Sequence, residues 1–217
     1  RSRTEKSILR RHAPELMGGV RDATLVEIGS GDCSKISLLL GALPPDALGT
    51  VTYVPIDVSP SAIQQSQKQL RQRFISLQVQ GLVADFLQRL DPVARHRNKL
   101  FCFFGSTIGN LARRQSERFL QRLGGLMQRG ERLLLGLDMV KDRAVLERAY
   151  NDKKDVTACF NKNILRVVNR TIEADFDPDR FRHRAFFNEQ ERRIEMHLVA
   201  TSDMTIGSPC LDRDLEI

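Results

Sequence analysis

The chain has 217 residues, enough for one large domain or a domain with an elaboration, and its 41% hydrophobic and 28% charged residues are typical of a globular protein. No apolar run approaches the roughly 20 residues of a membrane span, and residues 1–6 lack the apolar core of a signal peptide. The net charge of +7 is spread along the chain and mixed with acids, which favours a solvated surface and leaves a polyanion partner as the alternative. We therefore expect a cytoplasmic protein without a membrane partner.

In chain order, the first expected element is a helix at residues 5–16, with Ile8, Leu9 and His12 on one face and Pro14 interrupting the pattern. Residues 24–57 then have the order of a nucleotide-binding βαβ unit. Its parts are an apolar run, a glycine turn, a helical segment and a second apolar run, at residues 25–28, 29–32, 35–43 and 51–56. Asp57 follows the second run, where an acid can accept hydrogen bonds from ribose hydroxyls.

The next segments continue the alternation of strands and helices. Ser59, followed by Pro60, is expected to cap a helix that runs through Phe74. Further strands are predicted at residues 77–84, 100–104 and 132–137. A helix is predicted at residues 116–128, with an apolar face of Phe119, Leu120, Leu123 and Leu126. This order predicts an α/β fold with a mostly parallel, Rossmann-like sheet and helices on both faces.

Polar or glycine residues follow each of the five expected strands. They are Gly29, Asp57, Asp85, Gly105 and Asp138. Because ligands bind outside the carboxyl ends of strands in open α/β sheets, these five positions should surround one cleft.

The pattern changes after about residue 141. Helices are expected at residues 144–150 and 156–170, and strands at 181–188 and 193–201. We therefore predict a cofactor-binding domain at residues 22–142. Residues 1–21 together with 143–217 are expected to form a small α+β substrate-binding subdomain or lid.

The cysteines and histidines give no sign of a metal site. The four cysteines form no CxxC pair and are expected to be free thiols, with Cys102 buried. The four histidines are isolated in the sequence. We predict no metal.

The glycine turn discriminates between nucleotide cofactors. The NAD pattern GxGxxG requires glycine at position 34, where Ser34 stands, and no Walker A loop is present. Glu27-Ile28-Gly29-Ser30-Gly31 is similar to the ExGxG of class I S-adenosylmethionine methyltransferases. That resemblance implies ribose binding by Asp57, and adenine binding by Asp85 and Phe86. The competing interpretations are that Asp57 caps the next helix and that Phe86 is core.

A second motif follows the expected fourth strand. Many amino-group methyltransferases carry Asp/Asn-Pro-Pro-Tyr there, whereas residues 104–111 are Phe-Gly-Ser-Thr-Ile-Gly-Asn-Leu. This octet resembles the histidine-specific methyltransferase family of ergothioneine biosynthesis, which makes Nα,Nα,Nα-trimethylhistidine. Further matches to that family occur in the same order at residues 3–5, 8–9, 136–142, 149–152, 156–161, 169–170 and 194–196.

The resemblance implies a site in two parts. The residues implied to contact S-adenosylmethionine are Gly29, Ser30, Gly31, Lys35, Asp57, Asp85, Phe86, Gly105 and Ser106. Asn110 is implied to bind the carboxylate or amine end of an amino-acid substrate, and Tyr150 to lie near the accepted amine; these two are the expected catalytic residues. Met196 is implied to line the imidazole end. The competing interpretations are a helix-entry turn for Asn110, surface packing for Tyr150 and core packing for Met196.

The predicted function is methylation of the α-amine of a free amino acid, histidine above all, by a monomeric enzyme that uses S-adenosylmethionine. The family residues that recognise the imidazole ring lie beyond position 217, and its N-terminal tyrosines precede position 1. We therefore expect the chain to be incomplete at both ends. The alternatives left open are a methyltransferase of another small amine, a nucleic-acid methyltransferase and an inactive cofactor-binding homologue.

Overall fold

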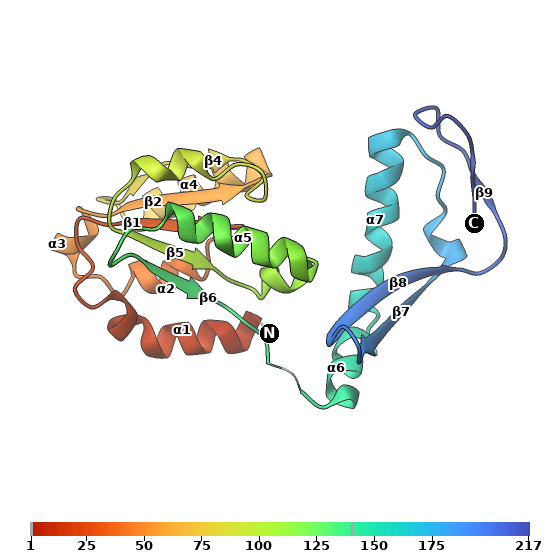
Figure 1. The fold of residues 1–217 in the computed structure, drawn as a ribbon, viewed down its shortest axis with the longest axis horizontal. Coiled ribbons are helices and arrows are strands. Elements are labelled where there is room, and N and C mark those ends of the chain that lie inside the picture. The colour runs from red at the N-terminus through yellow and green to blue at the C-terminus, as the bar shows by residue number, and fades with distance from the viewer. Residues whose placement is uncertain (1, 140) are drawn as a thin grey trace. The chain divides into compact units, whose positions relative to one another are not determined.

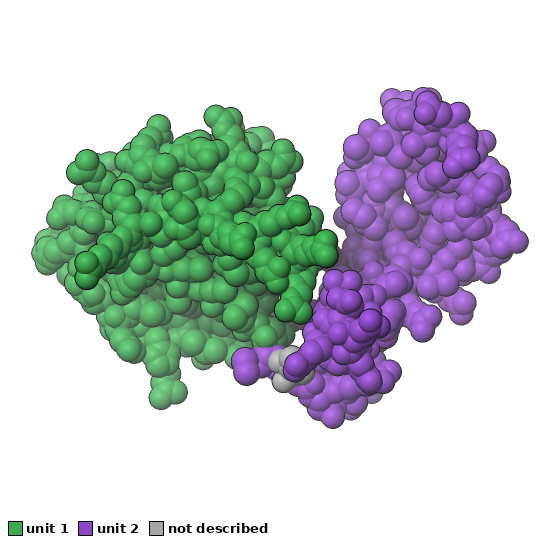
Figure 2. Space-filling view, in the orientation of Figure 1, with its two compact units in different colours: residues 1–138 green, residues 139–217 purple. Residues whose placement is uncertain are grey.

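The computed structural model describes residues 2–139 and 141–217. The chain divides after Asp138 into two compact units, which are coloured green and purple in Figure 2. The N-terminal helix packs within unit 1, whereas the sequence analysis grouped residues 1–21 with residues 143–217. That grouping concerned substrate binding, and it stays a prediction.

Unit 1 is built on a parallel sheet with the strand order β3-β2-β1-β5-β6, in which β4 also pairs with β2. The strands are β1 Thr24–Ile28, β2 Thr52–Asp57, β3 Gln78–Val79, β4 Leu82–Val83, β5 Lys99–Phe103 and β6 Arg132–Leu135. Each of these pairings is parallel, as the sequence predicts. The strand order reverses direction between the neighbours β1 and β5, and a ligand cleft forms at the carboxyl end of such a switch point.

Successive side chains on the central strands point to opposite faces of the sheet, and they contribute to two hydrophobic cores, one on each face. On β1, Leu25 belongs to one core and Val26 to the other; on β5, Cys102 and Phe101 divide in the same way. Figure 1 shows the helices of unit 1 around the sheet. They are α1 Ser2–Met17, α2 Ile36–Leu40, α3 Pro45–Leu48, α4 Pro60–Arg73 and α5 Arg113–Leu126, with short 3₁₀ turns at η1 Asp91–Arg95 and η2 Thr107–Asn110.

Two helices differ from the expected faces. In α1 the buried residues are Leu9, Ala13 and Met17, while Ile8 and His12 are exposed. The helix continues through Pro14, because burial of Ala13 and Met17 stabilises its last turn despite the lost backbone hydrogen bond.

Helix α5 begins at Arg113, three residues before the expected start. It buries Phe119 and Leu123, but Leu120 is exposed, so the prediction for Leu120 was wrong. The buried stripe of this helix is therefore narrower than the four apolar residues suggest.

The expected third strand is divided into β3 and β4 by Gln80 and Gly81. A Cβ at Gly81 would overlap the side chain of Ile63 on α4. The glycine thus allows helix α4 to approach the sheet closely at this point. The predicted cap of α4 is confirmed, because the Ser59 side chain accepts a hydrogen bond from the Ala62 amide at 3.3 Å.

Unit 2 contains two helices, a long antiparallel hairpin and a short two-stranded sheet. These are α6 Arg143–Tyr150, α7 Val156–Ile172, β7 Phe181–Asn188 with β8 Arg193–Ala200, and β9 Thr205–Ile206 with β10 Leu215–Glu216, with a 3₁₀ turn at η3 Pro178–Arg180. The last pair was not predicted. The small core of the unit consists of Leu165, Phe181, Met204 and Ile206.

The expected free cysteines are confirmed, and Cys102 is fully buried. Among the helices of the described residues, none combines the length and the hydropathy that crossing a membrane requires. The basic surface is mixed with acids as expected, since Arg113 pairs with Glu117 at 3.2 Å.

Candidate active site

The glycine turn after β1 is held against the end of β2 by backbone hydrogen bonds. The amides of Gly29 and Ser30 both donate to the Ile56 carbonyl, at 2.8 and 3.2 Å. Gly29 and Gly31 have φ of 67° and 52°, the left-handed region that glycine adopts at little cost. A Cβ at either glycine would meet no atom within 4 Å, so the backbone faces open space there. The turn is therefore shaped for close approach by a ligand.

Asp57 joins the glycine turn to the segment that enters α4. Its Oδ2 accepts a hydrogen bond from the Gly31 amide at 3.2 Å, and its Oδ1 accepts one from the Ser59 amide at 3.0 Å. Ser59, not Asp57, caps the helix. The carboxylate thus has a positional role beside the turn and is partly exposed, as a ribose-binding acid must be.

Ser30 carries the clearest sign of a ligand-binding position. Its Oγ is buried and is the one buried side-chain polar atom, among the described residues, without a hydrogen-bond partner. Leaving such a group unpaired costs about 1–3 kcal/mol. A polar ligand seated on the glycine turn would supply the partner, so the residues present fit a nucleoside cofactor with polar substituents.

A charged cluster lies beside the turn and joins three elements. Glu5 of α1 pairs with Lys35, which precedes α2, at 2.8 Å between Oε2 and Nζ. The same carboxylate accepts the amide of Gly105, which follows β5, at 2.8 Å through Oε1. Sequence analysis named Lys35 and Gly105 as site residues but missed Glu5. The signal was present, because Glu5 stands one turn before buried Leu9 on the same helical face.

Asp85 and Phe86 follow β4 on the same edge of the sheet. The Asp85 carboxylate accepts the Leu87 amide at 2.9 Å and the Gln88 side chain at 2.8 Å. Phe86 packs edge-on against the rings of Phe103 and Phe119, with centroids at 5.4 and 5.6 Å. Phe86 therefore contributes to the core, yet it remains partly exposed. Adenine binding by these two residues stays a prediction.

The segment after β5 turns sharply through two left-handed residues. Gly105 has φ of 79° and Ser106 has φ of 55°. The 3₁₀ turn η2 follows, anchored by buried Ile108 and ended by exposed Asn110. Asn110 is therefore in a turn, as one interpretation held, and its side chain is also accessible to a substrate.

Tyr150 ends α6 in unit 2 and is half-buried. His183 Nε2 lies 2.9 Å from the Tyr150 carbonyl oxygen, and Asn161 Nδ2 lies 3.0 Å from His183 Nδ1. Because the Asn161 amide donates, Nδ1 accepts and the Nε2–H donates to the carbonyl. The His183 ring thus holds the main chain at Tyr150.

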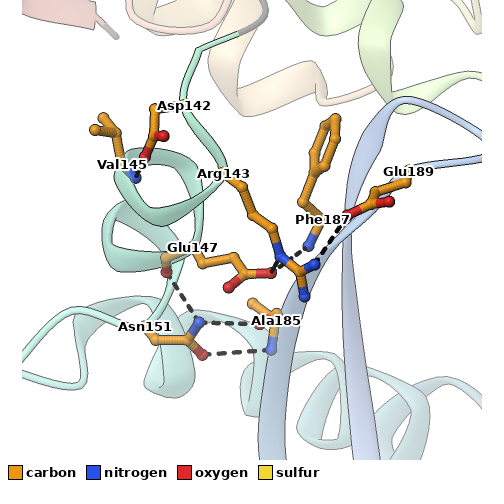
Figure 3. A network of polar contacts seen from close by, with 8 residues as sticks. All are labelled: Asp142, Arg143, Val145, Glu147, Asn151, Ala185, Phe187 and Glu189. Atoms are coloured by element: carbon orange, nitrogen blue, oxygen red, sulfur yellow. Dashed lines mark hydrogen bonds and ion pairs between the residues drawn. The ribbon is translucent and has the colours of Figure 1, made fainter.

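A second set of contacts ties α6 to strand β7 (Figure 3). Glu147 accepts hydrogen bonds from the Phe187 amide at 3.1 Å and from Arg143 Nε at 2.9 Å. The Asn151 side chain donates to the Glu147 and Ala185 carbonyls, each at 2.9 Å. Helix α6 is therefore fixed at both ends, which restricts the position of the tyrosine at its last residue.

Met196 lies on β8, where it pairs with Ala185 of β7. The residue is 37% exposed, so it is not core, and the core interpretation was wrong. Unit 1 thus collects the predicted cofactor residues and Asn110 on its own surface. Tyr150 and Met196 belong to unit 2.

A family model described as histidine-specific, S-adenosylmethionine-dependent methyltransferase matches residues 1–217. The chain belongs to this family. The match confirms the predicted family and its cofactor dependence, and with the parallel sheet order it confirms the class I methyltransferase fold.

Curated relatives agree with this assignment. The chain is 41% identical to the histidine N-alpha-methyltransferase of Mycobacterium tuberculosis over 97% of its own length, and 38% identical to that of Mycolicibacterium smegmatis over 99%. It spans 65% and 67% of these two proteins. It is also 29% identical to a 4-dimethylallyltryptophan N-methyltransferase of Arthroderma benhamiae, covering 94% of this chain and 64% of that protein.

Proposed function

We propose that the protein transfers methyl groups from S-adenosylmethionine to the α-amine of free histidine. The observation that carries this proposal is the glycine turn, in which open backbone, an unpaired buried hydroxyl and Asp57 converge. The family match and the two mycobacterial relatives support histidine as the amino acid.

The residues of the carboxyl edge would hold the cofactor. When bound, it supplies a methyl group on a positively charged sulfonium, an activated form that needs no metal. Gly29 and Gly31 have no side chains, so the ligand can approach the backbone closely there. The Ser30 hydroxyl can form a hydrogen bond with it. Asp57 accepts hydrogen bonds from the ribose, and Lys35 provides a positive charge for the carboxylate of the methionine part.

The substrate residues would bind and orient the amino acid. Asn110 offers an amide that can both donate to a carboxylate and accept from an amine. Tyr150 offers a hydroxyl that can hold the neutral amine with its lone pair in one direction. Positioning of this kind lowers a barrier by up to about 7–11 kcal/mol.

The proton of the substrate ammonium must leave before methylation. A nearby cation lowers the pKa of an ammonium group, so the neutral amine is favoured inside such a site. Water can accept this proton, and no side chain is required as a general base. Asn110 and Tyr150 then act by orientation.

A second candidate substrate is a tryptophan-derived amino acid. It is favoured by the similarity to a 4-dimethylallyltryptophan N-methyltransferase, at 29% identity over nearly the whole chain. Both candidates join an α-amino acid to a planar aromatic ring. They differ in the ring, which is polar in histidine and larger and more apolar in the tryptophan derivative.

Mass spectrometry of reaction mixtures tests the proposal. The protein is incubated with labelled S-adenosylmethionine and each of the twenty amino acids, and separately with 4-dimethylallyltryptophan. Labelled mono-, di- and trimethylhistidine are expected. Label in the tryptophan derivative alone would establish the second candidate, and no labelled product from a protein that binds the cofactor would contradict the proposal.

A further inference from the structure

We propose that Glu5 binds the α-ammonium group of the methionine part of the cofactor, beside Lys35, which binds its α-carboxylate. The two side chains would form one receptor for a zwitterion. This inference rests on the proposed function, because it assumes that S-adenosylmethionine occupies the carboxyl edge of unit 1.

The first support is the pairing of opposite charges at the correct place. Glu5 Oε2 and Lys35 Nζ are 2.8 Å apart, with side chains 19% and 16% exposed. An amino-acid head group carries both charges a few bonds apart, so a fixed carboxylate and ammonium side by side are complementary to it.

The second support is unused bonding capacity on both groups. A carboxylate offers about four lone-pair sites, and the Gly105 amide and Lys35 occupy only part of this capacity on Glu5. Lysine has three N–H donors, and among the described residues the Glu5 carboxylate is the one acid within ion-pair distance of Lys35. Lys35 can therefore keep Glu5 as a partner and donate one more hydrogen bond, and Glu5 can keep its partners and accept one more.

The third support is that the backbone is shaped around the Glu5 carboxylate. Strands β5 and β6 are followed by Gly105 and Gly136, and a Cβ at Gly136 would overlap Glu5 Oε1. A Cβ at Gly105 would lie 3.1 Å from Lys35 Nζ. The Gly136 amide donates a hydrogen bond of 2.9 Å to the Phe103 carbonyl, which holds Gly136 beside the end of β5. Both strand ends thus leave room for one carboxylate.

The fourth support is the charge balance around the pair. Lys6, next to Glu5 on α1, lies 4.0 Å from Asp32 of the glycine turn. The Ser34 hydroxyl and, more weakly, Lys6 and Lys35 lower the pKa of Asp32, which keeps it ionised. The cluster therefore contains two acids and two bases. A neutral set of alternating charges favours a zwitterion over a simple anion or cation.

Four ligands that differ only at the head group test the proposal. S-Adenosylhomocysteine has both charges, its decarboxylated analogue has the ammonium alone, its deaminated analogue has the carboxylate alone, and 5′-methylthioadenosine has neither. Titration calorimetry measures the affinity of each for the wild-type protein and for Glu5→Gln. Glutamine keeps an acceptor for the Gly105 amide but loses the negative charge.

Glu5→Gln is expected to lower the affinity of both ammonium-bearing ligands by about 10- to 100-fold, the range for a hydrogen bond to a charged group. Methylthioadenosine should bind as in the wild type. The deaminated analogue should bind equally well or more tightly, because Lys35 no longer shares its charge with Glu5. Glu15→Gln, at an exposed position on the same helix, is the matched control and should change none of the four affinities.

Equal weakening of all four ligands by Glu5→Gln would overturn the proposal, because Glu5 would then serve only to fix α1. Unchanged binding of all four would overturn it as well. If Glu5→Gln impairs folding, Glu5→Asp takes its place. It should lower the affinity of the ammonium-bearing ligands selectively, because the carboxylate is retained on a shorter side chain that reaches less far. Asp57→Ala separates this test from the proposed function: if it leaves all four affinities unchanged, the cofactor site itself is misplaced.

Discussion

The hydroxyl of Tyr53 donates a 2.5 Å hydrogen bond to the carboxyl group of Glu27 beneath the glycine turn. Both side chains are buried, Glu27 on β1 and Tyr53 on β2. Burial raises the pKa of Glu27 to about 8, although the Tyr53 hydroxyl and the Lys35 charge act in the opposite direction. Burial likewise raises the pKa of Tyr53. The turn thus rests on a carboxyl group that is protonated at neutral pH.

The first prediction concerns pH and stability. Because the pKa of Glu27 rises from 4.5 to about 8 on folding, the native state binds more protons than the unfolded state between these values. The free energy of unfolding should therefore fall as pH rises from about 5 to about 8, by up to several kcal/mol. Glu27→Gln keeps an acceptor for Tyr53 and cannot ionise, so its urea midpoint should vary less over this window. Glu15→Gln should retain the wild-type pH dependence; a Glu27→Gln curve parallel to the wild type would contradict the prediction.

The second prediction concerns Ser30. Ser30→Ala removes a buried hydroxyl that has no partner, so the ligand-free protein should be equally stable or more stable by about 1 kcal/mol. The affinity for S-adenosylhomocysteine should decrease by about 3- to 10-fold if the hydroxyl bonds the ligand. Thermal melts with and without ligand measure both effects. Loss of stability in the ligand-free protein would show that the hydroxyl is already satisfied.

The third prediction concerns Asp57. Asp57→Ala should lower the affinity for S-adenosylhomocysteine by at least about 10-fold, because it removes the hydrogen-bond acceptor for the ribose and leaves the Gly31 amide without its partner. Calorimetry measures the affinity, with Asp46→Asn as an exposed control whose partner is Arg21. Ser59→Ala, which removes only the cap of α4, should lower stability by about 1 kcal/mol and change the affinity little. The two variants therefore separate ligand binding from helix capping.

The fourth prediction divides the substrate residues by kinetic effect. Asn110→Ala should raise the KM for histidine strongly, by about 10-fold or more, because a hydrogen bond to a charged substrate group is lost. Tyr150→Phe should lower kcat by a similar factor with a smaller change in KM, because orientation of the amine is lost. Initial rates over a range of histidine concentrations distinguish the two. Unchanged kinetics for both variants would contradict the assignment of Asn110 and Tyr150 as substrate-binding residues.

The local signals along the chain were sufficient for the order of the main strands and helices, but not for the short pair β9 and β10. Apolar runs of strand length, the glycines at 29 and 31, and Ser59 before Pro60 each act within a few residues. Such features set backbone conformation and capping directly, so they can be interpreted without long-range information. The family resemblance likewise depended on motifs in their sequence order, and the family model confirms it.

The tertiary structure decided which residues meet. Glu5 reaches the amide of Gly105 across 100 positions of the chain. The close approach of Ile63 of α4 to Gly81 depends on how α4 lies on the sheet, and the exposure of Leu120 depends on how α5 lies on it. These outcomes follow from packing between distant elements, whose energies no local pattern encodes. The sequence by itself therefore determined the family, the fold class and the glycine turn, whereas only the folded chain placed the Glu5 carboxylate beside Lys35.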